Sequence, residues 1–344
     1  MAYTTINNGS LFMNPKLYTG NGSTNAITGV GFQPDFTWIK GRSYSDSHVL
    51  SDVVRGAESQ LYSNTNGTVT TYNDMLTSFD TDGFTVGSGG KVNTNGATLV
   101  AWNWLAGTAV SGNTTGSGTY KTYTGSVNTT SGFSIIKYTG NGSAGHTIPH
   151  HLGVAPTFRI TKNTSIADWP IYNEVLGNTK EIKFTETAAG TTTNYWNSTS
   201  PNATNFTLGT NGITNANNEN YISYNFTPIQ GYSKFSSYTG NGSTDGTFVY
   251  TGFKPAWIMI KRTDATDSWC MYDNKREGYN VDNDALFANQ TSTENSDDTI
   301  DLLSNGFKLR GTQTRINSSG GNYIFMAFAE APLVGTNNVP ANAR

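Results

Sequence analysis

The hexapeptide Tyr18-Thr19-Gly20-Asn21-Gly22-Ser23 occurs three times in this chain of 344 residues, and its other copies begin at Tyr138 and Tyr238. Composition alone does not produce six identical residues three times, so the hexapeptides mark copies of one structural unit. Each hexapeptide carries two glycines, which adopt the tight and positive-φ conformations that other residues rarely reach. We therefore predict that these glycines form a turn in every copy. They are Gly20, Gly22, Gly140, Gly142, Gly240 and Gly242.

The sequence after each hexapeptide repeats one series of segments. A proline follows 16 to 18 residues after the opening tyrosine and precedes an apolar strand that ends in a lysine. A second strand follows, and each copy closes on an aromatic strand whose last aromatic residue lies 86, 88 or 90 residues after that tyrosine. These spacings predict three homologous units. The closing residues are Trp104, Phe226 and Phe328.

The lysine that ends the first strand is a candidate for pairing with the polar residue that ends the second. Cross-strand pairs of this kind contribute only about 0.2–1 kcal/mol each, so the prediction concerns placement more than stability. The lysines are Lys40, Lys162 and Lys261, and the residues expected beside them are Asp52, Asn173 and Asp273.

Composition and periodicity both indicate a β protein. The chain has 38 Gly, 18 Tyr and 17 Phe, and only 13% of its residues are charged. Apolar residues alternate with period two, as at Trp102 and Trp104, which predicts strands with one buried and one solvated face. Short strands separated by Gly, Asn and Ser turns are typical of sandwiches and jelly rolls. We predict an all-β protein of three tandem, homologous, jelly-roll-like β-sandwich units.

The repeats and the local composition divide the chain into six segments. The stretch between the first two units is rich in Gly, Thr and Ser and is predicted to be a linker. The polar ends are predicted to be ordered by contact with a neighbour. The segments are an N-terminal tail at 1–14, unit 1 at 15–105, the linker at 106–132, unit 2 at 133–230, unit 3 at 231–334 and a C-terminal tail at 335–344.

Charge and hydropathy argue against several partners. The net charge is −3 and the basic residues are scattered singly, which offers no footprint for nucleic acid or for an anionic membrane. No apolar run approaches the ~18 residues of a membrane helix, and the N-terminus lacks the features of a signal peptide. The chain is expected to be used without insertion into a membrane. Its one cysteine, Cys270, is expected to be a small buried hydrophobe.

Two clusters contain residue types that bind metals. His146, His150 and His151 lie close together in sequence, but the other units have no histidine there and no carboxylate or cysteine completes a set. Asp80 and Asp82 resemble the start of a calcium loop that lacks the later ligands. We predict no metal site and no cofactor, and expect a solvated loop and a turn at these places.

No catalytic motif is apparent. The chain has no Gly-x-Ser-x-Gly elbow, no His-Glu-x-x-His pair and no two acids in matching contexts of the kind that glycosidases use. The repeated features also occur in all three copies and serve folding there, whereas an active site would need residues that occur once. We therefore predict a protein that is not an enzyme and has no catalytic residues.

Tryptophans outside the closing strands are the candidates for contact with a glycan or a partner. Exposed aromatic rings stack on sugars, but large aromatic side chains are more often buried in a core. Both interpretations stay open at this point, with at least two of the three expected to be buried. The candidates are Trp169, Trp196 and Trp269.

The run Gly252–Asp264 and the ending Ala327–Pro332, together with the tandem hexapeptides, resemble a family of poorly characterised structural proteins of tailed phages, especially marine and cyanobacterial ones. The likeness extends from about Lys16 to Leu333. It implies a virion component that is assembled in the host cytoplasm. The implied partners are other virion proteins and a host surface glycan, with homo-oligomeric or lattice-associated assembly.

Two positions in the virion are compatible with this resemblance. The first is a tail-fibre or receptor-binding component that attaches to the host, and the alternative is a capsid decoration, or cement, protein. A glycan depolymerase and a soluble lectin are the further alternatives. Three similar units in one chain would also imitate a trimer and suit a threefold position.

Overall fold

The computed structural model describes residues 2–340 except 166–167, 189, 277–283 and 298. Strands make up 45% of the chain and helices 5%, so the protein is all-β, as the sequence predicts. Every strand pairing is antiparallel among the strands described. Each unit has a large sheet and a small one that pack face to face as a sandwich, and none of the described helices is long and apolar enough to span a membrane.

The three units share one strand order. The large sheet of unit 1 has the order β1 (Met13–Thr19), β9 (Thr98–Trp104), β3 (Phe36–Gly41), β4 (Val49–Asp52), β5 (Gly56–Leu61), β6 (Thr70–Thr71), and its small sheet has the order β2 (Asn25–Thr28), β8 (Gly83–Val86), β7 (Leu76–Asp80). The large sheet of unit 3 has the order β21 (Ser233–Thr239), β28 (Asn322–Pro332), β23 (Phe253–Arg262), β24 (Cys270–Asp273), β25 (Leu286–Phe287), and its small sheet β22 (Phe248–Tyr250), β27 (Gly306–Leu309), β26 (Ile300–Leu303).

Unit 2 repeats the order of the large sheet and extends it, while its small sheet gains a strand at one edge and has no described strand equivalent to β7 or β26 at the other. Its large sheet runs β10 (Thr108–Asn113), β12 (Thr122–Asn128), β13 (Phe133–Thr139), β20 (Asn220–Phe226), β15 (Phe158–Asn163), β16 (Pro170–Asn173), β17 (Lys180–Lys183), β18 (Thr191–Thr192). Its small sheet runs β11 (Thr115–Gly116), β14 (His146–Pro149), β19 (Asn205–Leu208). A single helical turn precedes each closing strand: α1 (Gly90–Asn93), α2 (Gly212–Asn215) and α3 (Thr314–Asn317).

The predicted linker at 106–132 is wrong as a description of that segment. It contributes β10 and β12 to the large sheet of unit 2 and β11 to the small sheet. Glycine, threonine and serine are common in flexible linkers, but here an adjacent sheet edge supplies hydrogen-bond partners for the backbone. We call this segment, residues 106–132, the insertion.

The hexapeptides form the same tight bend in all three units, and their two glycines have different roles. A Cβ at Gly20 would lie 2.1 Å from the carbonyl oxygen of Thr94, so the first glycine permits close backbone approach. Gly22 has a φ of 67°, in the left-handed region that favours glycine. Gly140 and Gly240 repeat the first role, with 2.3 and 2.5 Å to a backbone oxygen, and Gly142 and Gly242 repeat the second, with φ of 74° and 68°.

The prediction of one solvated sheet face is wrong for the central strands. Strands β3, β4, β15 and β16 are buried at every position, and β9 and β20 are buried except at their first residue. One face of each large sheet packs on the small sheet of its own unit. The other face meets the neighbouring units, which the sequence pattern of one unit does not reveal.

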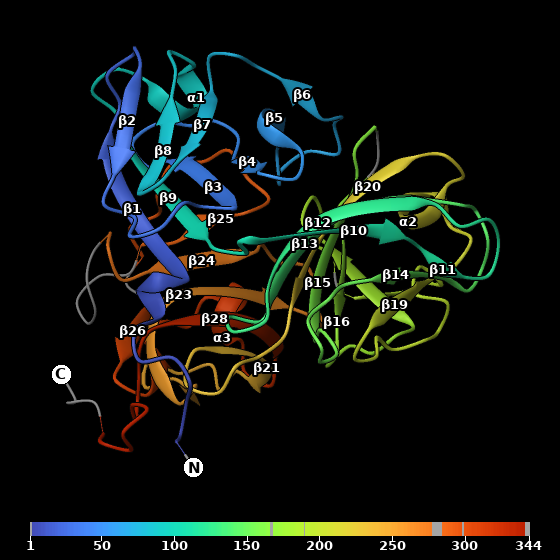
Figure 1. The fold of residues 1–344 in the computed structure, drawn as a ribbon. Helices are drawn as coiled ribbons and strands as arrows, with labels where there is room; N and C mark the ends of the chain where they lie inside the picture. Colours follow the sequence, from blue (N-terminus) through green and yellow to red (C-terminus); the bar gives the residue numbers. More distant parts are fainter. Residues whose placement is uncertain (1, 166–167, 189, 277–283, 298, 341–344) are drawn as a thin grey trace.

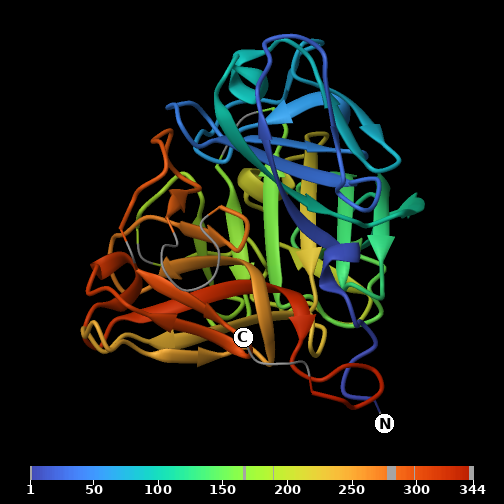
Figure 2. The ribbon, with the colours of Figure 1, turned by 90° about the vertical axis from the view of Figure 1, so that its left-hand side faces the viewer.

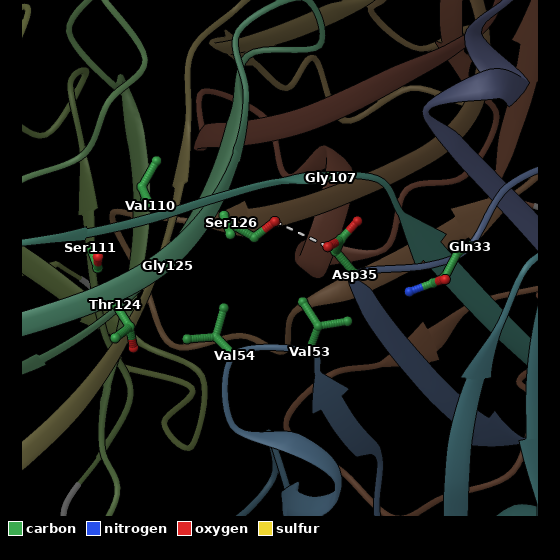
Figure 3. Close-up of a pocket in the computed structure, with 11 residues that line it drawn as sticks. Gln33, Asp35, Val53, Val54, Gly107, Val110, Ser111, Thr124, Gly125 and Ser126 are labelled. Carbon is green, nitrogen blue, oxygen red and sulfur yellow. Dashed lines mark hydrogen bonds between the residues drawn. The ribbon is translucent and has the colours of Figure 1, made fainter.

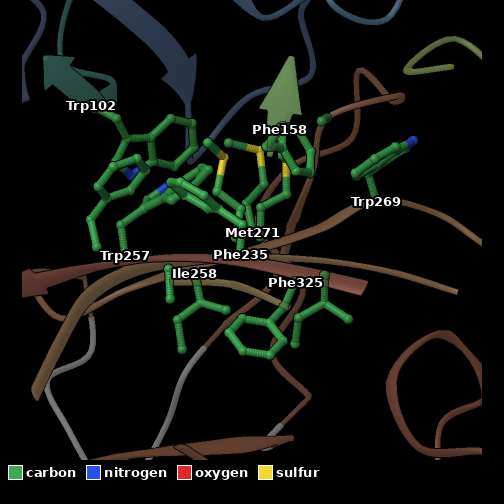
Figure 4. Close-up of a cluster of buried hydrophobic side chains, with 14 of the residues drawn as sticks. Trp102, Phe158, Phe235, Trp257, Ile258, Trp269, Met271 and Phe325 are labelled. Atoms are coloured by element: carbon green, nitrogen blue, oxygen red, sulfur yellow. The ribbon is translucent and has the colours of Figure 1, made fainter. Parts of the chain in front are cut away.

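The three units surround a shared hydrophobic core (Figure 1). The closing aromatics meet there, with ring centroids 5.8 Å apart for Trp104 and Phe328 and 5.9 Å for Phe226 and Phe328. Figure 4 shows part of this core, where Trp102, Phe158 and Trp257 come from three different units. Since each unit buries one face only against the others, the three are parts of one folded body.

The two ends of the described chain lie together beside unit 3 (Figure 1, Figure 2). The Tyr3 backbone N–H donates to Asn338 Oδ1 at 3.0 Å, and Asn7 Nδ2 donates to Thr336 Oγ1 at 2.6 Å. The tails predicted to need a neighbouring molecule therefore contact each other within the chain.

Candidate functional site: the junctions between units and the cleft beside Asp35

Each strand lysine lies fully buried at a junction between two units. Lys40 Nζ donates to the Thr291 carbonyl of unit 3 at 3.2 Å, and Lys261 Nζ donates to the Thr187 carbonyl of unit 2 at 3.1 Å. Lys162 Nζ lies 3.5 Å from the Asn66 carbonyl of unit 1. The contacts run from unit 1 to unit 3, from unit 3 to unit 2 and from unit 2 to unit 1. This cyclic direction is that of a heterologous, closed threefold ring.

A backbone hydrogen bond accompanies each lysine contact at the same relative position. In each junction, the carbonyl that accepts this bond belongs to the residue two positions after the lysine. The amide that donates it belongs to the residue three positions after the one whose carbonyl the lysine binds. The bonds are Glu294 N–H to Arg42 at 3.1 Å, Val69 N–H to Thr164 at 2.8 Å and Gly190 N–H to Thr263 at 3.2 Å. The three junctions are therefore equivalent in their lysine and backbone contacts, and the chain has internal pseudo-threefold symmetry.

The predicted pairing of these lysines with Asp52, Asn173 and Asp273 is wrong. Asp52 Oδ2 instead accepts from Arg55 Nε at 2.6 Å and from the Tyr224 hydroxyl of unit 2 at 2.7 Å. Both charged side chains of this pair are nearly inaccessible, with 3% and 0% exposure. In units 1 and 3 an arginine three residues after the aspartate takes the carboxylate, and in all three units the lysine donates to backbone carbonyls.

The junction of units 3 and 1 uses the same arrangement. Asp273 Oδ2 accepts from Arg276 Nε at 2.7 Å and from Trp102 Nε1 of unit 1 at 2.9 Å. Arg276 also reaches Glu294, which pairs in turn with Arg42 of unit 1. A buried carboxylate thus links an arginine of its own unit to a donor of the next unit.

The junction of units 2 and 3 replaces all three partners together. The positions equivalent to aspartate and arginine hold Asn173 and Leu176, and the position equivalent to Trp102 and Tyr224 holds Met326. A buried ion pair can be replaced without a large loss of stability only when no charged or polar partner is left unpaired. Here the carboxylate, the arginine and the hydrogen-bond donor are all replaced together, so this condition is met. Units 2 and 3 also pack through Phe158 and Phe235, with ring centroids 6.1 Å apart.

The buried lysines predict a rise in stability with pH. Burial lowers the pKa of Lys40, Lys162 and Lys261 to about 8 each, from 10.5 in a solvated chain. Between these values each lysine binds more protons in the unfolded chain than in the folded one, so the lysines increase the free energy of unfolding as pH rises from about 8 to about 9. Closer to pH 10 the buried tyrosines, whose pKa burial raises, oppose this increase. Urea titrations across this window are expected to show the rise, and the triple Lys→Met variant is expected to flatten it. A wild-type curve without slope would contradict the prediction.

All three candidate tryptophans are buried, so none contacts a glycan from the surface as a candidate site requires. Trp169 Nε1 donates across the junction to the Tyr62 carbonyl at 3.0 Å, and Trp269 Nε1 donates to the Lys183 carbonyl at 2.8 Å. Trp196 lies inside unit 2, with its ring 4.3 Å from the Arg159 guanidinium. Two of the three therefore serve the junctions between units.

A cleft of about 490 Å³ lies between unit 1 and the insertion (Figure 3). Val53 and Val54 line one side, and residues of β10 and β12 line the other. Asp35 closes one end, 7% exposed, where its carboxylate accepts from the Ala106 N–H and from Ser126 Oγ, both at 3.0 Å. Burial raises the pKa of this carboxyl despite these hydrogen bonds. Because the insertion occurs once, the cleft breaks the threefold pattern.

The histidine cluster is dispersed in the structure. His146 is buried, with its ring nitrogens 2.9 Å from Asn215 Oδ1 and 2.7 Å from Thr114 Oγ1. His150 lies 2.9 Å from the Asn202 carbonyl, and only His151 is exposed. In the part of the chain that the structure describes, no group of three or more His, Cys, Asp or Glu side chains is arranged to hold a metal ion. The solvated loop expected here is thus wrong for His146 and His150.

Asp80 and Asp82 stabilise the turn between β7 and β8. Asp80 accepts from Thr85 Oγ1 at 2.6 Å, and Asp82 accepts from the N–H groups of Gly29 and Gly31 at 2.9 and 2.6 Å. Those amide donors hold the pKa of Asp82 below its usual range. Both carboxylates are occupied with local hydrogen bonds.

Cys270 is fully buried in β24, as the sequence predicts. Burial raises the pKa of its thiol to about 12, which suppresses the reactive thiolate. The native chain is expected to leave a thiol reagent such as 5,5′-dithiobis(2-nitrobenzoate) unreacted over hours, while the urea-unfolded chain releases one equivalent of thionitrobenzoate. Rapid reaction of the native chain would place this thiol at the surface and contradict the structure.

One repeated asparagine that holds the turns is not apparent from the sequence. Asn93 accepts from the Asn21 N–H at 2.8 Å and donates to the carbonyls of Gly87, at 2.6 Å, and Ser23, so it holds the hexapeptide bend to the turn before the closing strand. Asn215 and Asn317 make the equivalent bonds in units 2 and 3. Each lies 11 residues before its closing aromatic, a constant spacing that an Asn-rich composition obscures.

Comparison with known proteins identifies one family. The family model described as Domain of unknown function (DUF7483) matches residues 8–332. The chain belongs to the DUF7483 family. No curated protein and no solved structure matches the chain. The DUF7483 match covers all three units and the insertion, so the family is defined by the whole pseudo-threefold body and not by a single repeat.

Proposed function

We propose that this chain is a non-enzymatic structural protein of a phage virion, exposed on the particle as part of the tail-fibre or receptor-binding apparatus. The observation that carries a structural role is the use of the repeated residues. The hexapeptides and their asparagine partners hold turns, and the strand lysines join each unit to the next. Residues retained in all three copies therefore maintain a closed body.

The attachment role is supported by the features that depart from the threefold pattern. Recognition of one ligand needs a site that occurs once, and the cleft beside Asp35 is formed by the only insertion between units. It lies between two units, which is a common place for binding sites, and its volume falls in their usual range of about 300–1,000 Å³. Its polar groups and paired valines suit a neutral, hydroxyl-rich ligand better than a charged one.

Capsid decoration is the second candidate, and the pseudo-threefold body favours it. A chain with three equivalent junctions presents matching surfaces around one axis, which suits a threefold or quasi-threefold position of a shell lattice. On this alternative the body is the functional element, and the cleft is incidental.

Labelling of purified particles with a gold-conjugated antibody to this chain tests the proposal. Label at the tail, with competition of infection by the purified chain, is the expected result. Label over the head, with hundreds of copies per particle by quantitative mass spectrometry, would replace attachment by decoration. Absence from purified particles would refute a virion role. Release of reducing ends from host surface glycan would identify a depolymerase, and glycan binding without particle association would identify a lectin.

A further inference from the structure

The three units differ at one edge of the small sheet. In unit 2, β14 lies between β19 and β11, and β11 belongs to the insertion. The equivalent strands in units 1 and 3, β2 and β22, lie at the sheet edge and, among the strands that the structure describes, pair only with β8 and β27. Unit 2 therefore has an added strand at a position that stays open in the other two units.

The open edge of unit 3 also carries exposed aromatic side chains. Phe248 and Tyr250 are 43% and 46% exposed, while Val249 between them points into the core with 6% exposure. The residues equivalent to these two aromatics are Ala26 and Thr28 in unit 1 and Thr147 and Pro149 in unit 2. An exposed hydrophobic edge strand is a template for pairing, and proteins usually avoid or cover one. Among these three equivalent edges, only the one in unit 3, at β22, has both exposed aromatic side chains and no neighbouring strand described on its outer side.

The backbone of β22 is oriented to receive a strand. The Thr247 carbonyl accepts from the Leu309 N–H of the β27 side at 3.1 Å, so the backbone groups of Phe248, one residue on, point to the open edge. In unit 2, Thr115 of β11 pairs with Thr147, the residue equivalent to Phe248. The Tyr250 carbonyl already accepts from Lys234 Nζ at 2.8 Å, at the end that β11 leaves uncovered in unit 2. A strand with the length and position of β11 fits on β22 without displacing Lys234.

We propose that β22 binds an extended segment of a different polypeptide by antiparallel strand addition, in the position that β11 occupies in unit 2. Near this edge Lys308 and Asp245 pair with each other at 2.5 Å, and the Lys234 ammonium is bound to the Tyr250 carbonyl, so the edge favours an uncharged segment. Among the described residues no other segment of this chain pairs with this edge, β11 is already paired with β14, and the connection between units 2 and 3 is short, so we assign the occupant to a different polypeptide. This inference holds whether or not the protein is part of a virion.

The test uses the full-length chain and a synthetic peptide with the sequence of residues 111–121, which contains β11. The site in unit 2 is filled by its own insertion, so added peptide has the open edge of β22 available. At millimolar peptide, hydrogen exchange of the Phe248 amide is expected to slow at least tenfold. Phe248→Pro removes the outward N–H at an edge position where proline is tolerated, and with it the reporter amide. Binding of the fluorescently labelled peptide, followed by anisotropy, is therefore measured for this variant and is expected to be lost. Ala26→Pro, at the equivalent place in unit 1, is the matched control and is expected to leave the protection of Phe248 unchanged.

Failure of the peptide to slow exchange of the Phe248 amide, or peptide binding that survives Phe248→Pro, overturns the proposal. Sedimentation of the chain without peptide tests the other possible occupant of β22, which is a second copy of this chain. A dimer that Phe248→Pro dissociates would show that a second copy pairs through β22, and the assignment to a different polypeptide would then be wrong.

Discussion

Replacing Asp52 by asparagine is expected to lower the free energy of unfolding by about 3–5 kcal/mol, since it leaves a buried arginine without its counterion. Arg55 is 3% exposed, and Asp52 is the one carboxylate with which it pairs among the described residues. The same carboxylate accepts from the Tyr224 hydroxyl of unit 2, so the variant also weakens the junction of units 1 and 2. Urea unfolding followed by tryptophan fluorescence measures the loss.

The junction of units 2 and 3 supplies the matched control. The triple variant Asp52→Asn, Arg55→Leu, Tyr224→Met copies the residues found there, namely Asn173, Leu176 and Met326. It removes the charge, the counterion and the donor together, and is expected to recover at least half of the lost stability. A triple variant no more stable than Asp52→Asn would mean that the loss arises from packing and not from the unpaired charge.

Replacing Asn215 by alanine is expected to lower the free energy of unfolding by about 3 kcal/mol or more, since each buried polar group left without a partner costs roughly 1–3 kcal/mol. The side chain accepts from the Asn141 N–H at 3.0 Å and donates to the carbonyls of Ser143 and Gly209, at 2.9 and 2.7 Å. Its loss releases the hexapeptide bend of unit 2 from α2. Hydrogen exchange of the Asn141 amide is expected to accelerate along with the global loss.

Asn217 provides the control for this variant, because it is exposed and lies two residues after Asn215, just beyond the end of α2. Asn217→Ala is expected to change stability by less than about 0.5 kcal/mol, as surface substitutions usually do. Equal effects of the two substitutions would contradict the role assigned to Asn215.

The interiors of the three units could be predicted from the sequence to the extent that local rules govern them. The hexapeptides located the bends, and period-two alternation with turn residues located most strands, because both depend on backbone geometry within a few residues. The sequence also predicted that at least two of Trp169, Trp196 and Trp269 are buried, and all three are, but it did not show that Trp169 and Trp269 lie at junctions between units. An aromatic side chain on a strand looks the same in sequence whether it faces solvent or a neighbouring unit.

The sequence by itself determined the all-β class, the threefold repetition and the buried cysteine, since each is written in residues close together in the chain or in constant spacing. The tertiary structure decided that the units close around one core, that Lys40, Lys162 and Lys261 bind carbonyls of the neighbouring units, and that the insertion becomes three strands. These contacts join segments tens to hundreds of residues apart. The side chains in these contacts bind the backbone groups and carboxylates that the packed sheets leave without another partner. Which groups those are is defined only once the sheets have packed together.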